Sequence, residues 1–278
     1  MGRARLIDAH VHFWALGRGD YPWPTPDDAT LYRDFAPADL RADAHADVPA
    51  AVVLVQAAPT IAETRHLLAL ADAEPLVGAV VGWVDFTDPG TPATLEDLAR
   101  HPAFRGVRPM LQDLTPDWIL DPRFGAVFET LIRLDLSFDT LVRPAHLPAV
   151  GELLRRHPRL RLVIDHGAKP AIGDGAWEPW ASGITALAAA GAHVKLSGLL
   201  TEAAGDAEAV RPYAAHLLES FPPDRTLWGS DWPVLRAAGT YRAWLNPCRA
   251  LVAPRGDAAA DAIFGGTAAR FYGVTACG

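Results

Sequence analysis

Short apolar segments alternate with longer amphipathic segments along almost the whole chain. The apolar segments are rich in Val, Ile, Leu and Ala, most of them end on a polar side chain, and they lie at 6–14, 50–58, 77–85, 104–110, 137–142, 160–167, 192–198 and 226–233. Near-continuous apolar runs of this length are typical of strands that are buried on both faces, as in a parallel sheet.

A helical pattern follows nearly every one of these segments. The predicted helices lie at 60–73, 94–100, 124–134, 147–157, 178–190, 207–221, 236–252 and 257–272. Thr60 and Glu63 fit a capping box at the start of the first of them. About eight strands, each followed by a helix, predict a closed, parallel (β/α)8 TIM barrel that forms a single domain over 1–278. A doubly wound open sheet is the alternative, but it needs fewer strands or a domain boundary that the composition does not show.

The connection after the first strand differs from the others. Residues 17–47 are rich in Pro, Asp and Trp, and the prolines at 22–26 are too dense for a regular helix or a central strand. Aromatic residues are interleaved throughout, and long connections inside compact domains are usually lids or binding loops. We therefore expect an ordered excursion here, with a helix that begins near Pro37.

The first strand carries two histidines, His10 and His12, near its end. Side chains two positions apart in a strand point to the same face. The two imidazoles are therefore expected side by side, an arrangement that suits a metal ion or a polarised carbonyl. From this pair alone, a strand end with two incidental histidines is an equal alternative.

In a TIM barrel the active site lies at the C-terminal ends of the strands. The candidate residues at these positions are His10, His12, Gln56, Asp85, Arg108, His166, Lys195 and Asp231. Buried polar groups without a partner cost about 1–3 kcal/mol each, so a polar group at nearly every strand end predicts a polar pocket. Each also has a structural alternative. Asp231 could cap the following loop, and His166 could be a hydrogen-bonded core histidine. Lys195 could be the partner in a structural ion pair, and Arg108 could pair with a nearby carboxylate.

Two further expectations follow from the same strand ends. Asp165 alternates with His166, so we expect its side chain to face the helices. The tryptophans expected at the rim, where they would stack on a sugar ring or roof the pocket, are Trp14, Trp23, Trp83 and Trp232.

Composition and charge exclude several classes of partner. The formal net charge of -8 and the sequence pI near 5.6 argue against a nucleic acid or an anionic membrane. No apolar run approaches the roughly 20 residues of a membrane helix, and the first residues show no long apolar signal segment. Cys248 and Cys277 form no close-spaced motif. The sequence predicts a reduced, cytoplasmic protein that acts on a small molecule and leaves the oligomeric state open, a homo-oligomer included.

Lysine is almost absent from the chain. Of the 25 lysine and arginine residues, only Lys169 and Lys195 are lysines. A lysine that persists in such an arginine-rich chain is expected where arginine cannot replace it, because the two groups differ in shape and in pKa behaviour.

Several longer motifs resemble those of a known family. The segments IDAHVHFW, FRGVRPMLQD, LVIDHGAKP, VKLSGLLTEA, GSDWPV and IFGGTAARFYG resemble the amidohydrolase superfamily, in its amidohydrolase-2 branch, and within it the sugar-lactonase group of L-fuconolactonases and L-rhamnonolactonases. The resemblance covers nearly the whole chain.

The resemblance implies a catalytic site and a set of substrate-binding residues. The catalytic residues would be His10, His12, His166 and Asp231, and Arg108 and Lys195 would bind substrate oxygens. The positions at the strand ends and the rim add further substrate-binding candidates, which are Gln56, Trp14, Trp83 and Trp232. The same four catalytic residues would hold one divalent metal ion such as zinc if one is bound, and metal-independent catalysis is equally open. The superfamily's strand-five histidine is not evident, since His146 lies past the strand end, so a binuclear centre is not expected. Pro109 stands where such sequences often have histidine, which leaves the substrate open.

The hypothesis from the sequence is therefore hydrolysis of an aldonolactone to the sugar acid. Asp231 accepts a proton from the attacking water, and His166 orients Asp231 or the water. Within the superfamily, the alternative is a hydrolase or decarboxylase of an anionic, aromatic-derived dicarboxylate. Such a substrate should need several arginines, whereas the sequence offers only Arg108 and, as a second candidate, Arg143. A non-catalytic ligand-binding barrel is the alternative from a different class.

Overall fold

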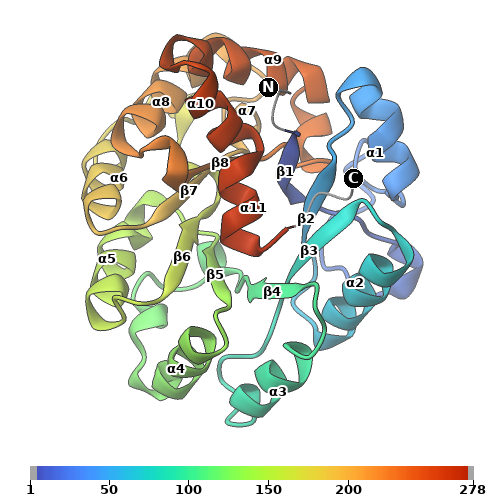
Figure 1. The fold of residues 1–278 in the computed structure, drawn as a ribbon, viewed down its shortest axis with the longest axis vertical. Helices are drawn as coiled ribbons and strands as arrows, with labels where there is room; N and C mark the ends of the chain where they lie inside the picture. Colours follow the sequence, from blue (N-terminus) through green and yellow to red (C-terminus); the bar gives the residue numbers. More distant parts are fainter. Residues whose placement is uncertain (1–4, 275–278) are drawn as a thin grey trace.

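Eight parallel strands run in sequence order around a barrel in the computed structural model, which describes residues 5–274 (Figure 1). The strands are β1 (Ile7–Val11), β2 (Ala51–Val55), β3 (Val77–Gly82), β4 (Phe104–Val107), β5 (Ser137–Thr140), β6 (Arg161–Ile164), β7 (His193–Leu196) and β8 (Thr226–Trp228). The segment after β8 closes on β1, because the His12 N–H donates to the Trp232 carbonyl at 2.8 Å and the Asp231 N–H donates to the His10 carbonyl at 2.9 Å. The predicted (β/α)8 barrel is confirmed.

Helices surround the strands on the outside of the barrel (Figure 1). They are α1 (Pro37–Ala44), α2 (Ile61–Ala73), α3 (Thr91–Leu98), α4 (Gly125–Arg133), α5 (Leu147–Arg156), α6 (Trp180–Ala189), α7 (Leu199–Glu202), α8 (Ala207–Ser220), α9 (Tyr241–Val252), α10 (Asp257–Asp261) and α11 (Thr267–Tyr272). The short helix α7 was not predicted. The helix expected from residue 236 begins at Tyr241, because a 3-10 turn at Val234–Ala237 precedes it.

Only half of the predicted capping box at α2 forms. The Thr60 hydroxyl accepts the Glu63 N–H at 3.0 Å, but the Glu63 carboxylate does not bond back to Thr60. It accepts the N–H groups of Ala57 and Ala58 instead, at 3.0 and 2.7 Å. Glu63 therefore fixes the loop after β2, which is part of the C-terminal face of the barrel.

The apolar core has two parts. Outward-facing strand residues pack against the surrounding helices, and inward-facing ones such as Val53 and Val163 pack with Phe271 and Tyr272 of α11. Figure 1 shows α11 lying across the opening of the barrel. A Cβ atom on Gly265, just before α11, would overlap the Arg5 carbonyl, which places this segment at the end where β1 begins. The opposite end, where the strands finish, is left for the polar residues.

The Pro- and Trp-rich segment folds back over that polar end. Trp14 and Phe35 exchange backbone hydrogen bonds of 3.1 and 2.9 Å, and the rings of Trp14 and Trp23 meet edge to face at 5.8 Å. The Thr60 hydroxyl donates to Asp20 at 3.0 Å and ties the segment to the start of α2. These contacts hold two tryptophans beside the strand ends.

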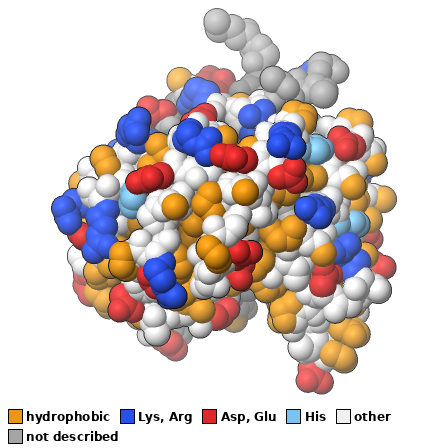
Figure 2. All heavy atoms as spheres, turned by 90° about the horizontal axis from the view of Figure 1, so that it is seen from below, with side chains coloured by type: hydrophobic (Ala, Val, Ile, Leu, Met, Phe, Trp, Pro, Cys, Tyr) orange, Lys and Arg blue, Asp and Glu red, His pale blue; other side chains and the backbone are white. Residues whose placement is uncertain are grey.

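The outer surface carries both signs of charge. Figure 2 shows acidic and basic side chains interspersed with apolar ones over one face of the molecule. Within residues 5–274, no helix combines the length and the apolar character needed to cross a membrane.

Candidate active site

β1 contains a β-bulge at the point where its histidines begin. Asp8 and Val11 are three positions apart in the sequence, but their partners in β2, Val52 and Leu54, are only two positions apart. The Asp8 carboxylate accepts the N–H groups of His10 and Ser230, at 3.2 and 2.8 Å, and so satisfies the backbone at this irregularity. Bulges redirect side chains and are common beside active sites. Here the Nε2 atoms of His10 and His12 lie 3.2 Å apart.

The Asp231 carboxylate lies where three imidazoles meet. Its Oδ1 atom is 3.7 Å from His10 Nε2, 3.5 Å from His12 Nε2 and 3.8 Å from His166 Nε2. His166 and Asp231 both follow the end of a strand and both have a positive φ, 53° and 60°. Left-handed backbone at non-glycine residues is uncommon and concentrates at functional sites.

The second ring nitrogen of each imidazole has a polar neighbour. His12 Nδ1 lies 2.8 Å from the Val55 carbonyl, His166 Nδ1 lies 2.9 Å from the Ser197 hydroxyl, and His10 Nδ1 lies 3.4 Å from Asp165. A carbonyl only accepts, so His12 carries its proton on Nδ1 and presents the Nε2 lone pair to the site. The other two contacts are compatible with the same arrangement.

Burial disfavours the charged forms of His10 and His166. Desolvation lowers the pKa of His166 to about 4 and, together with the charge of Lys195, lowers the pKa of His10 well below its usual value. Burial alone would raise the pKa of Asp231, but the three surrounding imidazoles outweigh it and hold the pKa of this carboxyl below its usual range. At neutral pH Asp231 is therefore an ionised carboxylate, and His10 and His166 beside it are uncharged.

A buried ionic network lies beneath His10. The Lys195 ammonium is fully buried, 2.6 Å from Asp139 and 3.0 Å from Asp165. The Tyr272 hydroxyl of α11 donates to Asp139 at 2.6 Å, and Lys195 Nζ is 3.2 Å from His10 Nδ1. The network therefore connects the helix that closes one end of the barrel with the histidines at the other.

This network corrects two predictions. Lys195 was predicted to bind substrate, but it is a buried ion-pair partner and does not line the pocket, because it points inward from the middle of β7. Asp165 was predicted to face the helices, which is wrong. Val163 already faces the interior, so alternation brings Asp165 inside as well, and His166 also reaches the site because the chain turns left-handed after the strand. The buried Asp139 was missed, although a lone carboxylate in the apolar segment 137–142 was a signal.

A cavity of about 320 Å³ opens above these groups. Its lining comprises His12, Trp14, Trp23, Ala57, Arg108, Met110, Gln112, Leu141, His166, Lys169, Thr201, Asp231 and Val234. The sequence predicted His12, His166, Asp231, Arg108 and the two tryptophans for this site. His10 lies just below the lining. The residues that sequence reasoning missed come from loops after the strands; among them, only Lys169 carried a signal, the scarcity of lysine.

Three other predicted substrate-binding residues lie outside the cavity. Gln56 is buried and braces Arg108. Its side-chain Nε2 donates to the Arg108 backbone carbonyl at 2.7 Å, and its backbone carbonyl accepts from the Arg108 guanidinium at 2.5 Å. Trp232 is buried and donates to Asp43 at 2.8 Å. The backbone N–H of Trp83 donates to Thr64 of α2, which ties the residue to the β3–α2 junction.

Other sequence candidates also lie elsewhere. Asp85 is exposed and accepts the N–H and the hydroxyl of Thr87 in a local turn. Arg143 is exposed and does not line the cavity. His146 lies in the turn after β5, where its ring contacts the carbonyls of Leu114 and Arg143.

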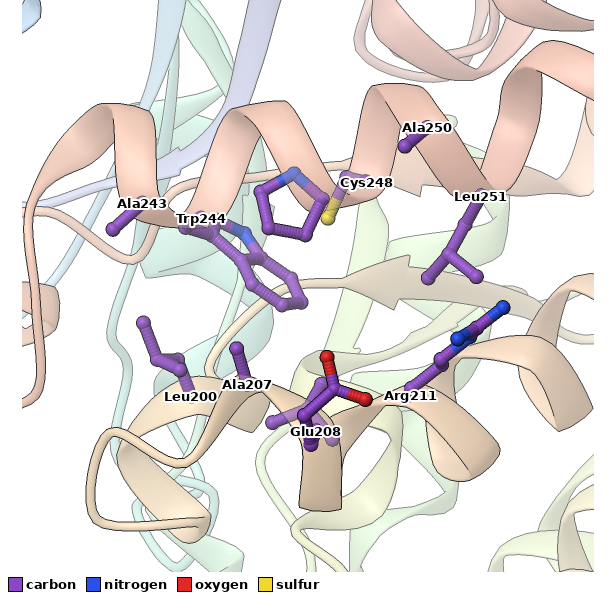
Figure 3. A pocket seen from close by; sticks show the side chains of 11 residues that line it. Leu200, Ala207, Glu208, Arg211, Ala243, Trp244, Cys248, Ala250 and Leu251 are labelled. Atoms are coloured by element: carbon purple, nitrogen blue, oxygen red, sulfur yellow. The ribbon is translucent and has the colours of Figure 1, made fainter.

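A second cavity, of about 310 Å³, lies on the outside of the barrel between α8 and α9 (Figure 3). Trp244, Cys248 and Leu251 of α9 face Glu208 and Arg211 of α8 across it (Figure 3). It contains none of the residues around Asp231. The chemistry therefore belongs to the cavity at the strand ends.

Comparison with known proteins places the chain in a family. The model of the family described as "Amidohydrolase" matches residues 7–274. The chain belongs to the amidohydrolase family. The resemblance inferred from the motifs is confirmed, and amidohydrolases are enzymes.

Similar proteins match over nearly their full length. An L-fucono-1,5-lactonase of Burkholderia ambifaria is 45% identical, with 96% of this chain and 94% of that protein covered. An L-fucono-1,5-lactonase of Burkholderia multivorans is 36% identical, with 98% of this chain and 97% of that protein covered. A solved amidohydrolase from Burkholderia multivorans with bound zinc is 35% identical and has a TM-score of 0.90, covering 98% of this chain and all of that one.

The residues around Asp231 fit one divalent ion. His10, His166 and Asp231 each offer a ligand atom, and these atoms lie within 4.8 Å of one another. His12 Nε2 adds a fourth, 3.2 Å from His10 Nε2 and 3.5 Å from Asp231. Zinc ligands at bonds of about 2.1 Å in a tetrahedron are about 3.4 Å apart. These separations therefore suit ligands that share an ion, and the polar neighbours of the second ring nitrogens suit it too.

Proposed function

We propose that this amidohydrolase hydrolyses a sugar lactone, a cyclic ester, to the open-chain sugar acid. The observation that carries the proposal is the Asp231 carboxylate, which lies within 3.8 Å of three imidazole Nε2 atoms at the floor of the cavity. The names of the two Burkholderia relatives, both L-fucono-1,5-lactonases, support this substrate class.

In the proposed reaction Asp231 is the general base. The lowered pKa of its carboxyl keeps it ionised at neutral pH, so it can accept a proton from the attacking water. A positioned base contributes roughly 10²–10⁴-fold to the rate. His166 orients Asp231 or the water, because its contact with Ser197 fixes the ring with Nε2 toward Asp231. Water attacks the lactone carbonyl carbon and forms a tetrahedral intermediate.

Arg108 stabilises the negative charge on the former carbonyl oxygen. Its guanidinium lines the cavity and is held by the Gln56 carbonyl, and its Nη1 is 3.4 Å from His10 Nε2. Its buried Nε has no hydrogen-bond partner among the described residues. Donors placed where charge develops are usually the largest single contribution to catalysis. When the intermediate collapses, the ring C–O bond breaks and Asp231 returns its proton to the leaving alkoxide.

His10, His12, His166 and Asp231 are the residues that would hold one divalent ion. Such an ion would supply Lewis acidity and lower the pKa of water in the site. Metal-independent hydrolysis by the same residues is the alternative. Metal analysis of the purified protein, with activity before and after chelation, distinguishes the two.

The test is a panel of sugar lactones, including L-fucono-1,5-lactone, with acid release followed by a pH indicator. Asp231→Asn should lower kcat by at least about 10²-fold with the fold intact by circular dichroism. Asp85→Asn is the matched control, since Asp85 also follows a strand but lies outside the cavity. Near-normal turnover by Asp231→Asn would contradict the assignment.

The two other hypotheses are less well supported. An anionic dicarboxylate needs several cationic groups that are free to bind it. The described lining of the cavity holds two cationic side chains, Arg108 and Lys169, and Glu202 already neutralises Lys169. A non-catalytic barrel has no use for a buried, ionised carboxylate beside three imidazoles. Saturable binding of lactones by calorimetry without turnover would favour the binding protein.

A further inference from the structure

One wall of the cavity is built from polar residues that the proposed reaction does not use. Lys169 and Gln112 lie on it together with Thr201, and all three line the cavity. We call these three residues the polar wall. Lys169 and Gln112 lie in the connections after β6 and β4, and Thr201 lies in the short helix α7 after β7.

Lys169 is held in place by two acceptors. Its ammonium lies 3.0 Å from Gln112 Oε1 and 3.2 Å from Glu202 Oε1. An ammonium has three N–H donors, so one remains after these two contacts. No further partner for Lys169 is found among the described residues. Its side chain is 20% exposed and lines the cavity. The remaining donor is available to a molecule inside.

The Thr201 hydroxyl is a second group without a partner. Its Oγ1 is enclosed and has no hydrogen-bond partner within the described part of the chain. Enclosed hydroxyl groups are normally hydrogen-bonded, because an unsatisfied one costs free energy. Two independent donors on the same wall therefore lack an acceptor.

The charge of the wall indicates what would bind it. The Glu202 carboxylate neutralises Lys169, and Gln112 carries no charge and donates to Asp113 through its Nε2. The wall thus offers donors without a net positive charge. Such a surface suits a neutral oxygen, a hydroxyl of a sugar, better than a carboxylate.

Lysine is also the residue that this position requires. The compact ammonium fits between two side-chain oxygens and still directs a third donor elsewhere, whereas the planar guanidinium fork of arginine is larger and fixes its donors in one plane. This accounts for a lysine in a chain where arginine otherwise replaces it.

We propose that Lys169, supported by Gln112 and joined by Thr201, binds a hydroxyl group of the lactone and determines specificity for hydroxylated over unsubstituted lactones. This inference rests on the proposed lactone hydrolysis and names the part of the substrate that the site recognises. Lys169 touches substrate in this proposal but takes no part in the bond changes.

The experiment compares L-fucono-1,5-lactone with δ-valerolactone, a six-membered lactone without hydroxyl groups. Lys169→Met should lower kcat/KM for the sugar lactone about 10- to 100-fold, mainly through KM, and change kcat/KM for δ-valerolactone less than about 2-fold. Thr201→Val should act in the same direction by about 3- to 10-fold. Lys169→Arg should also lose the preference for the sugar lactone over δ-valerolactone, because arginine does not replace the ammonium at this position. Arg133→Met removes an exposed cation paired with Glu96 and serves as the control.

Each outcome bears on a different statement. Equal losses on both lactones, or an unchanged preference in Lys169→Met and Thr201→Val, would overturn the inference while lactone hydrolysis stands. No turnover of any lactone by the unsubstituted enzyme would contradict the proposed function itself. Where δ-valerolactone turns over too slowly to measure, its inhibition constant against the sugar lactone gives the same comparison. If Lys169→Met fails to fold, Thr201→Val alone decides, because valine has nearly the shape of threonine.

Discussion

Replacing Lys195 with methionine should destabilise the protein strongly at neutral pH. Methionine approximates the apolar stem of lysine but leaves the Asp139 and Asp165 carboxylates without their shared cation, 2.6 and 3.0 Å away in the fully buried network. Removing one partner of a buried ion pair typically costs about 3–5 kcal/mol. Since domains have about 5–15 kcal/mol of stability in total, a large share of it depends on one ammonium group.

The loss of stability in Lys195→Met should depend on pH and should be larger at higher pH. Burial already raises the pKa of Asp139, partly offset by Lys195, whereas Lys195 and His10 hold the pKa of Asp165 well below its usual value against burial. Without the lysine, both carboxyls should have raised pKa values in the folded protein. The folded protein then binds protons more tightly than the unfolded chain, so its stability falls as pH rises. The deficit of Lys195→Met should therefore be smaller at pH 5 than at pH 8.

Urea unfolding followed by tryptophan fluorescence at several pH values measures both effects. Asp139→Asn supplies the matched test, because it should change the free energy of unfolding in opposite directions in the unsubstituted protein and in Lys195→Met. It should destabilise the unsubstituted protein by about 1–3 kcal/mol, but it should stabilise Lys195→Met by removing an unpaired buried charge. Two results would refute the reasoning. One is a free energy of unfolding for Lys195→Met within about 0.5 kcal/mol of that of the unsubstituted protein, and the other is an equal loss of stability from Asp139→Asn with and without Lys195.

Three other predictions concern stability alone. Ala204 is exposed with φ 49°, so Ala204→Gly should raise the free energy of unfolding by about 0.5–1 kcal/mol by relieving left-handed strain; a lower value in urea melts would contradict this. A Cβ atom on Gly106 would overlap the Ser137 hydroxyl and lie 2.7 Å from the Ser137 carbonyl oxygen. Gly106→Ala should therefore lower the free energy of unfolding by about 2–4 kcal/mol. An unchanged melting temperature would count against the close packing of β4 on β5. Burial raises the pKa of Glu63 from 4.5 to about 7, so its contribution to stability is present at low pH and is lost as pH rises through that range. The difference in stability between the unsubstituted protein and Glu63→Gln should accordingly become smaller from pH 5 to pH 7 in calorimetric melts. A stability difference that does not change with pH would exclude this titration of Glu63.

The barrel could be predicted from the sequence because each strand and each helix carries its own periodic signal. The residues at the floor of the site could also be predicted, since His10, His12, His166 and Asp231 follow apolar runs whose ends must meet at one rim. The rest depends on geometry that a linear pattern does not carry.

The network under His10 shows what a linear pattern leaves out. Whether Lys195 points into the pocket or into the barrel interior depends on how far along β7 it sits, and Asp139 is hidden in a strand whose neighbours in sequence are ordinary. Asp165 faces inward by the alternation of strand residues, and His166 reaches the site as well only because the backbone turns after the strand. Similarly, Met110, Leu141 and Thr201 reach the cavity through conformations of the connecting segments that the sequence does not specify by pattern.

The backbone turn after β6 carries both His166, for which we propose a role in orienting the base, and Lys169, for which we propose a contact with substrate. His166, Gly167, Ala168 and Lys169 all have positive φ, from 47° to 65°, a conformation that only glycine adopts without strain. Each of the three other residues costs the folded state about 1 kcal/mol or more. Directed evolution of this enzyme for heat resistance alone should therefore accumulate glycine at 166 and 169 and lose catalysis as it gains stability. A selection that retains both residues must find its stabilising substitutions elsewhere in the barrel.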